Sequence, residues 1–274
     1  MKKVLVIGDV IEDIIVISNG KRQLNTDNPS SIKATPGGSG ANFAVWLASL
    51  GVETELIARV SIKDKERLES YFKQVKVIPR LETDPIEETG KIVVLVEENN
   101  RTFYTDRAAN QNLELKDLSL EGINLLYISG YSVLSLGETK TQELIQAAKN
   151  QGVLVAVDPG STSFIESFGK DKFLSAIHGA DLIFPNQEEY RLLQEGMSSF
   201  PEVVITKGES GAEVLGVGKA EAVKVVVVDP TGAGDAFAAK YIAEKLSGTR
   251  PLEALELAND FAALAVTRTG GQPR

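Results

Sequence analysis

Short runs of Val, Ile and Leu recur along this chain, and a loop containing Gly or Pro follows most of them. We predict strands at 3–8, 53–60, 125–130, 153–159, 181–186 and 202–208. These runs are almost continuously apolar, as in parallel strands that are buried on both faces. We therefore expect an α/β fold, a three-layer αβα sandwich around a mostly parallel central sheet.

Amphipathic stretches lie between several of these runs. In 63–75, apolar residues recur at the i, i+3, i+4, i+7 spacing of a helix face (Leu68, Tyr71, Phe72 and Val75). The stretch 138–152 ends at Gly152, as a helix does at its C-cap. Alternation of strands and helices supports the parallel sheet.

Two segments interrupt the alternation. Residues 13–36 are rich in Asn, Ser and Lys, and residues 91–107 are predicted to be two strands joined at Asn99–Asn100. Such insertions predict a small β layer beside the main sheet, which would serve as a lid. No repeat or low-complexity linker divides the chain, so we expect a single domain over 1–274.

Composition excludes several function classes. A net charge of −9 argues against nucleic acid or an anionic membrane as the main partner. The absence of Cys excludes disulfides, thiolate zinc sites and cysteine nucleophiles. Acidic residues such as Asp9 interrupt the apolar start, which is therefore expected to be a buried strand rather than a signal peptide. No apolar run approaches the roughly 18 residues of a membrane span, so a cytoplasmic location is expected.

The stretch "DPTGAGDAF" at 229–237 follows the apolar run 223–228 and precedes a helical pattern. A strand, a glycine loop and a helix are predicted in that order. The bare backbone of Gly232, Ala233 and Gly234 would let a ligand approach, and amides at a helix start favour an anion. Asp235 at the same point either caps the helix or accepts a proton from a substrate hydroxyl.

Several motifs occur together in one order. They are "GDVIED" (8–13), "PGGSGANFAVWLASLG" (36–51), "FPNQEE" (184–189), "TKGESG" (206–211), "VVDPTGAGDAFAA" (227–239) and "AVTRTGGQP" (265–273). Over nearly its whole length the chain resembles the ribokinase (PfkB) family of carbohydrate kinases. The resemblance implies a ribokinase-like fold and transfer of the γ-phosphoryl of ATP to an alcohol of a small sugar or polyol, with Mg²⁺.

The resemblance also implies roles for single residues. Asp235 matches the catalytic base, and Gly232, Ala233 and Gly234 match the anion hole. The residues that match the substrate site are Asp13, Gly37, Gly38 and Asn42. The residues that match the nucleotide and Mg²⁺ site are Asn186, Glu189, Thr206, Lys207, Gly208, Gly211 and Asn259, with Asn186 and Glu189 binding Mg²⁺ through water. A K⁺ ion beside the anion hole would take oxygens from Asp229, Thr231, Ala265 and Gly270.

Structural alternatives stay open for these residues. Gly37 and Gly38 can form an ordinary loop before a helix, and Asn186 with Glu189 can cap one. Residues 206–211 can be only a tight turn between strands. Asn259 can be a polar residue on the exposed face of its helix.

The acceptor is less constrained than the reaction. Arg107 falls where the second interrupting segment ends, and it can bind hydroxyls or pair with a carboxylate or phosphate. Together with Lys21, Arg22 and Lys33, Arg107 favours an anionic sugar as the acceptor. The alternative is that these four charges are exposed to solvent and bind no substrate. A nucleoside is a further alternative, with Phe103 and Tyr104 as stacking residues. The exposed strands of the lid also allow a homodimer.

Other classes fit less well. No P-loop motif occurs, "PGGSGAN" lacks the third glycine of a dinucleotide fingerprint, and His178 is the only histidine. A sugar-binding regulatory protein on the same fold is the non-enzyme alternative.

Overall fold

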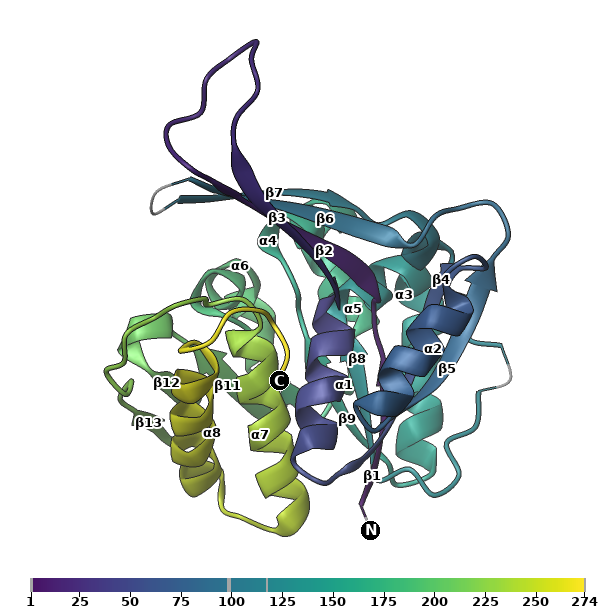
Figure 1. Cartoon of the computed structure of the whole chain (residues 1–274). Coiled ribbons are helices and arrows are strands. Elements are labelled where there is room, and N and C mark those ends of the chain that lie inside the picture. The colour runs from purple at the N-terminus through teal and green to yellow at the C-terminus, as the bar shows by residue number, and fades with distance from the viewer. Residues whose placement is uncertain (1, 98–99, 117, 274) are drawn as a thin grey trace.

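A large sheet forms the centre of the molecule in the computed structural model, which describes residues 2–97, 100–116 and 118–273 (Figure 1). Its strand order is β13-β12-β11-β10-β9-β8-β1-β4-β5. The strands from β11 to β5 are parallel, and β12 and β13 are antiparallel to their neighbours. The strands are β1 (Lys3–Ile7), β4 (Glu53–Ser61), β5 (Val77–Asp84), β8 (Leu125–Ser129), β9 (Leu154–Asp158), β10 (Leu182–Ile183), β11 (Glu202–Thr206), β12 (Ala212–Val214) and β13 (Gly218–Ala220).

Helices cover both faces of this sheet. One face packs against α1 (Ser39–Ser49), α2 (Lys65–Gln74), α7 (Ala233–Ser247) and α8 (Pro251–Ala265). The other packs against α3 (Gly130–Asn150), α4 (Thr162–Phe168), α5 (Lys170–Ala176) and α6 (Gln187–Met197). Alternate residues of a strand enter opposite cores: Val4 and Val6 enter the first, Leu5 and Ile7 the second. The expected three-layer αβα sandwich is confirmed.

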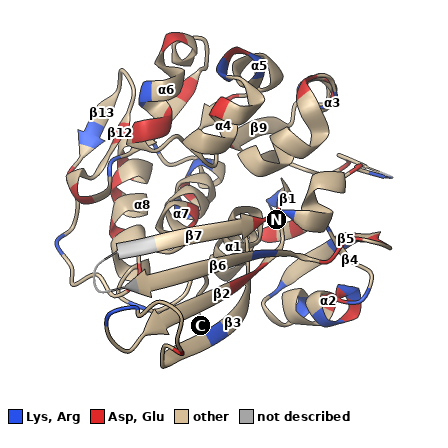
Figure 2. Cartoon of the chain, turned by 90° about the horizontal axis from the view of Figure 1, so that it is seen from above, with Lys and Arg blue, Asp and Glu red and all other residues tan. Residues whose placement is uncertain are grey.

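The two interrupting segments form a second sheet, called the small sheet below. It contains β2 (Ile11–Ser18), β3 (Ser30–Gly37), β6 (Gly90–Glu97) and β7 (Asn100–Asp106) in the order β3-β2-β6-β7. It lies across the top of the main sheet in Figure 1, and the connection from β2 to β3 extends away from the body. Figure 2 shows from above that few of its residues are charged. The predicted turn at Asn99–Asn100 includes Asn99, which lies outside the described residues.

Two local predictions were wrong or too long. Residues 223–228 are not a strand: they pair with no sheet, and Val226 is 83% exposed. The strand predicted at 181–186 is reduced to Leu182–Ile183 because Pro185 and the helix cap at Asn186 follow at once. The helix predicted at 138–152 is confirmed: it is the second part of α3, which kinks at Gly137 (φ 78°) and ends at Asn150, just before Gly152 (φ 70°).

No helix in the described part of the chain is long and apolar enough to cross a membrane.

Candidate active site

A pocket of about 170 Å³ lies at the carboxyl ends of the parallel strands, under the small sheet. Its floor includes Asp9, which follows β1, and the first residues of α1 and α7. Its roof is the inner face of β2, β6 and β7, which presents Ile92, Val94 and Phe103. Ligands of open α/β sheets bind at this edge, so the pocket is the candidate active site.

Asp235 faces this pocket from the first turn of α7. Ser39 Oγ donates a hydrogen bond to its Oδ1 (2.8 Å), and Asn42 Nδ2 donates to its Oδ2 (3.3 Å). Burial raises the pKa of Asp235 well above its ordinary value, and the nearby Asp158 carboxylate raises it further. The hydrogen bonds from Ser39 and Asn42 oppose that rise. The carboxyl group is therefore held in one orientation by two hydrogen bonds, with a raised pKa, and both features suit a general base.

Gly232 sets the start of α7. It is left-handed (φ 73°), and a Cβ on it would lie 2.4 Å from the Gly271 carbonyl oxygen. Only glycine fits both conditions. Ala233 N donates back to the Pro230 carbonyl, while the following amides belong to the first helical turn, which has no intrahelical acceptors. Beside Asp235, this turn can stabilise an anion.

The loop 8–10 and the start of α1 are joined by Asp9. Its carboxylate accepts hydrogen bonds from the Ser39 and Gly40 amides (3.1 Å each) and from Ser129 Oγ (3.1 Å). Asp9 thus satisfies the first amides of α1 from a distant part of the chain. Gly38 (φ 100°) lets the loop pass close to Asp9, since a Cβ on it would lie 2.6 Å from the Asp9 carbonyl oxygen. The predicted glycine turn therefore positions α1 against β1.

Asp13 lies on the pocket face of β2 and is 8% exposed. A Cβ on Gly37 would lie 2.1 Å from its Oδ2, so Gly37 leaves the space that the carboxyl group occupies. Burial raises the pKa of Asp13 to about 7, and the charges of Asp9 and Asp229 contribute. A carboxyl group buried at this cost, with its oxygens beside a pocket, is suited to bind substrate hydroxyls.

The Asp13 pKa predicts a pH-dependent stability. The unfolded carboxyl titrates near its ordinary value of about 3.9. As pH rises from there to about 7, the unfolded chain loses the proton that the folded protein keeps, so stability is lost across this window and is constant above it. Asp13→Asn should be more stable than the wild type at pH 8, by up to about 4 kcal/mol, and show no such gain at pH 4.

Urea unfolding at both pH values measures this effect. Asp27→Asn, in the exposed connection between β2 and β3, is the matched control and should change stability little at either pH. A gain for Asp13→Asn that is equal at pH 4 and pH 8 would contradict the assignment.

Asn186 and Glu189 form a capping box at the start of α6. Asn186 Oδ1 accepts from the Glu188 and Glu189 amides (2.9 Å each), and Glu189 Oε2 accepts from Asn186 N (2.8 Å). Asn186 and Glu189 therefore do cap α6. The surroundings of Glu189 also change the pKa of its carboxyl group. Burial raises the pKa of Glu189 to about 7. Burial also raises the pKa of Asp158 at the end of β9, and the Glu189 carboxylate raises it further.

Two buried carboxyl groups with raised pKa values, one of which raises that of the other, suit a cation beside them. Mg²⁺ is held in proteins by one or two carboxylates and keeps most of its water. Within the described ranges no group of three or more acidic, His or Cys side chains could hold a metal directly. Glu189 and Asp158 therefore fit a hydrated Mg²⁺ rather than a fully protein-bound one.

The stretch 206–211 is a tight connection between β11 and β12, with the short helix η2 (Gly208–Ser210). Gly211 (φ 80°) is required, since a Cβ there would lie 2.0 Å from the Ala220 carbonyl oxygen. Lys207 pairs with Glu213, so contact with a phosphate would require that pair to open. Asn259 donates to the Glu221 carbonyl and so ties α8 to the irregular segment 221–228.

Asp229 joins two loops beside the anion site. Its Oδ1 accepts from Thr231 N and its Oδ2 from Gly270 N, both at 2.9 Å. Asp229 N and Val228 N donate to the Val266 carbonyl, next to Ala265. The structure thus gathers the residues predicted to bind K⁺, and the ion itself stays a prediction.

Arg107 lies where β7 ends and contributes to the pocket wall. Its guanidinium donates to the Tyr131 carbonyl (2.5 Å) and to Ser135 Oγ (2.6 Å), and it lies over the Phe164 ring. Burial lowers the pKa of Arg107, and the Asp9 charge opposes that. Among the described residues no carboxylate forms an ion pair with it.

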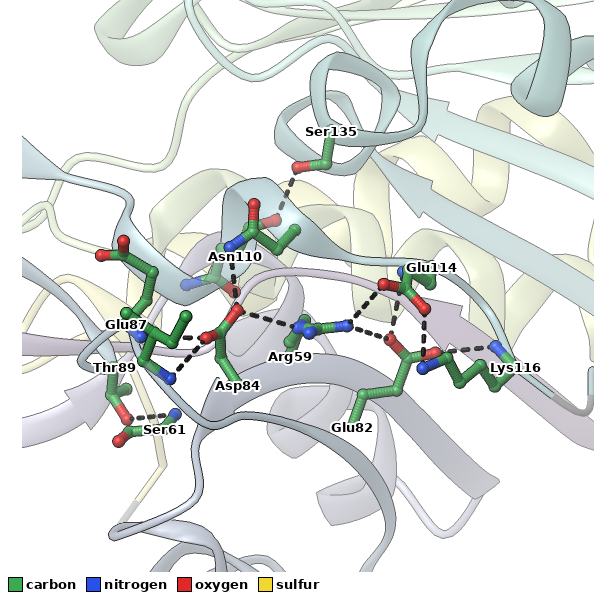
Figure 3. Close-up of polar contacts among 12 residues, drawn as sticks. Arg59, Ser61, Glu82, Asp84, Glu87, Thr89, Asn110, Glu114, Lys116 and Ser135 are labelled. Carbon is green, nitrogen blue, oxygen red and sulfur yellow. Dashed lines mark hydrogen bonds and ion pairs between the residues drawn. The ribbon is translucent and has the colours of Figure 1, made fainter.

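A polar network around the buried Arg59 and Asp84 contacts the residues that follow Arg107 in the chain (Figure 3). Arg59 on β4 binds Asp84 (3.2 Å) and Glu114 (3.3 Å), and Asn112 donates to Asp84 (2.8 Å). Asn112 ends the short helix η1 (Ala108–Asn112). The network therefore ties η1 to the carboxyl ends of β4 and β5.

Asn110 of η1 completes the connection. It accepts from Val10 N (3.1 Å) and donates to the Val10 carbonyl (2.8 Å), and its own carbonyl accepts from Ser135 Oγ (2.7 Å). The connection from β1 to β2 is thereby fixed to the same wall.

The structure brings Asp13, Gly38, Asn42, Arg107, Thr231, Gly232 and Asp235 into one pocket. The Asn42 side chain donates a hydrogen bond to Asp235, and its Oδ1 accepts one from Gln272 Nε2 (2.9 Å). Sequence reasoning missed Asp9, Ser39 and Asp158. A carboxylate directly after a predicted strand marks Asp9, and one near the end of a predicted strand marks Asp158, whereas no local signal marks Ser39.

Comparisons with known proteins agree with this geometry. The sequence profile described as pfkB family carbohydrate kinase matches residues 1–274. Probable fructokinase-6, chloroplastic, of Arabidopsis thaliana is 28% identical over 305 residues, which are 98% of this chain and 79% of that protein. A nucleoside kinase of Methanocaldococcus jannaschii is 27% identical over 265 residues, covering 90% of this chain and 85% of the relative.

Bifunctional protein HldE of Pseudomonas fluorescens is 28% identical over 302 residues, covering 97% of this chain but only 60% of HldE. Among solved structures, a ribokinase II of E. coli in complex with ATP and Mg²⁺ superposes with a TM-score of 0.85. It is 24% identical, and the match covers 99% of this chain and 94% of that one.

Proposed function

Because the chain belongs to the pfkB family of carbohydrate kinases, we propose that it transfers the γ-phosphoryl group of ATP to an alcohol of a small sugar or polyol. The observation that carries this proposal is Asp235, a carboxylate oriented by two hydrogen bonds that faces the pocket from the first turn of α7. A general base and an amide-lined anion site then lie side by side, as phosphoryl transfer to a hydroxyl requires.

In the proposed reaction the acceptor hydroxyl gives its proton to the Asp235 carboxylate. Its oxygen forms a bond to the γ-phosphorus, while the bond from that phosphorus to the bridging oxygen breaks and ADP leaves. The amides of Gly232 to Asp235 stabilise the charge on the phosphoryl group. Asp13 binds other acceptor hydroxyls and so fixes which hydroxyl reaches the base.

The nucleotide is proposed to bind beside the anion site, along 206–211 and the irregular segment 221–228. Val227 and Val228 are exposed there, and the hydrogen bond from Val228 N to Val266 O brings α8 with its exposed Leu264 close by. An apolar surface of this kind suits the face of an adenine ring. Bound Mg²⁺ would neutralise phosphate charge, with Glu189 and Asp158 holding its water.

The small sheet is proposed to act as a lid that excludes water from the transferring phosphoryl group. Its pocket face is largely apolar, and three of its four connections to the main body contribute a residue to the pocket, namely Asp9, Gly38 and Arg107. Hydrogen exchange of β2 and β6 with and without ligands would test this role. The homodimer through this sheet and the K⁺ site stay predictions.

The proposed function is tested by incubating the protein with ATP, Mg²⁺ and a panel of neutral sugars, polyols, sugar acids, sugar phosphates and nucleosides, and following ADP release. We expect acceptor-dependent release with at least one sugar or polyol. Acceptor binding without turnover across the panel would instead favour a sugar-binding regulatory protein, and turnover only of nucleosides would make it a nucleoside kinase.

A second candidate is a kinase of an anionic sugar, which Arg107 favours. This guanidinium lies in the pocket wall, and two hydrogen bonds hold it without a carboxylate partner among the described residues. A buried cation in that state can pair with a carboxylate or phosphate of the acceptor.

Arg107→Met separates the two candidates. For an anionic acceptor, kcat/KM should fall about 10- to 100-fold, as expected when a hydrogen bond to a charged group is lost. For a neutral sugar the fall should stay below about fivefold. Lys91→Met is the matched control. It removes a half-exposed cation of β6 that pairs with Glu88. Equal losses for both acceptor classes would contradict an anion-binding role.

A further inference from the structure

Tyr127 lies in the middle of β8, in the core layer below α1, and is fully buried. Its ring stacks on Phe43 of α1, with centroids 3.6 Å apart and planes 5° from parallel. Full burial and this stacking restrict where the phenolic hydroxyl lies. Leu125 of the same strand lies in the same core and is apolar. Packing in this layer therefore requires a hydrophobic side chain but no hydroxyl.

The Tyr127 hydroxyl is the one buried side-chain polar atom without a hydrogen-bond partner in the described part of the chain. A buried hydroxyl without a hydrogen bond destabilises the folded protein, so we expect a specific role for Tyr rather than Phe at position 127. Burial raises the pKa of Tyr127 well above its ordinary value, and the carboxylates of Asp158, Asp235 and Asp9 raise it further. Ser39 lies four residues before Phe43, on the same face of α1 against which the Tyr127 ring packs, and its hydroxyl opposes this rise.

Ser39 is the link between the phenol and the base. A serine hydroxyl has one proton and two acceptor lone pairs. The Ser39 proton goes to Asp235 Oδ1 at 2.8 Å, and the Ser39 amide is already bound to Asp9. The oxygen of Ser39 can therefore accept a hydrogen bond while its proton serves Asp235.

We propose that Tyr127 is a positioning residue for the base: its phenolic hydroxyl donates to Ser39 Oγ and thereby commits the Ser39 proton to Asp235. A hydroxyl that accepts one hydrogen bond donates a stronger one, so the pair acts cooperatively. The phenol makes no hydrogen bond to another group in the described part of the chain, so its proton is available to Ser39 and the proposed chain runs from Tyr127 through Ser39 to Asp235. This inference rests on the proposed function only in calling Asp235 a base, since the hydrogen-bond chain itself can be measured without turnover.

The experiment is a double-mutant cycle with Tyr127→Phe and Ser39→Ala, read by carbon-13 NMR titration of the Asp235 carboxyl group. Asp235→Asn assigns the resonance. The charged groups that face Asp235, namely Asp158 and Asp9, stay in place in every variant. Tyr127→Phe should raise the Asp235 pKa, because the Ser39 proton is then free to turn away from the carboxylate. In the Ser39→Ala background the same substitution should have no further effect.

Turnover provides the second measurement. Tyr127→Phe should lower kcat about fivefold at neutral pH, the value of one hydrogen bond, with both KM values unchanged. The acidic limb of its kcat profile should move to higher pH, since a base with a raised pKa ionises later. Tyr241→Phe, which removes another buried phenol on α7 that donates to Glu202 (2.8 Å), should leave the titration and the profile unchanged.

The outcomes separate this inference from the proposed function. An Asp235 pKa that Tyr127→Phe leaves unmoved, or moves equally with and without Ser39, overturns the positioning role even if the enzyme is active. Coupling through Ser39 supports it, even if no acceptor in the panel is phosphorylated and the proposed function fails.

Discussion

Asp235→Asn should reduce kcat by about 10²- to 10⁴-fold, the usual contribution of a general base. The amide keeps the size of the carboxylate and can still accept the hydrogen bond from Ser39, so the start of α7 should stay intact. The amides of the anion site are unchanged, and nucleotide affinity should therefore remain close to that of the wild type. Steady-state kinetics with the acceptor found in the panel, together with calorimetric titration of ATP, measure both quantities.

The matched control is Asp260→Asn, which neutralises an exposed carboxylate on α8. It should leave kcat unchanged. If Asp235→Asn turned over at nearly the wild-type rate, Asp235 would be only a helix residue, and the proposed mechanism would be wrong.

Gly232→Ala should be the second most damaging substitution. The left-handed backbone at this residue disfavours any Cβ by about 1–2 kcal/mol, and the added atom would meet the Gly271 carbonyl at 2.4 Å. The first turn of α7 must then move away from the segment 270–272. Because its amides are proposed to face the phosphoryl group, kcat should fall about 10²- to 10³-fold.

Gly248→Ala separates the loss of the anion site from backbone strain. Gly248 ends α7 with a similar backbone (φ 88°), but no heavy atom lies within 4 Å of its added Cβ. This variant should lose similar stability from strain and keep its kcat. Thermal unfolding and kinetics of both variants provide the comparison. A kcat for Gly232→Ala within threefold of the wild type would contradict the anion site.

Much of the architecture could be predicted from the sequence, because its strands are local and apolar. The runs at 3–8 and 125–130 became β1 and β8 almost to the residue. The carboxyl ends of such strands meet at one edge, so a pocket near Asp13, a few residues after the first strand, was expected from the parallel sheet. Asp235 reaches the same pocket although the run before it is not a strand.

Long-range contacts set the limits of that prediction. The apolar run 223–228 has the composition of a strand, but a strand also needs a neighbour with free backbone groups, and this segment binds the end of α8 instead. Ser39 lies 196 residues from Asp235, and nothing around "GGSGAN" indicates that its hydroxyl serves a base. The capping box of Asn186 and Glu189 matches both helix capping and a metal site, because the same carboxylate can do both.

The most direct test of the central claim is a crystal structure with a non-hydrolysable ATP analogue, Mg²⁺ and the acceptor. We predict an acceptor hydroxyl within hydrogen-bond distance of the Asp235 carboxylate, with the γ-phosphate against the amides of Gly232 to Asp235. An acceptor bound away from Asp235, or a γ-phosphate that does not reach the start of α7, would contradict the account.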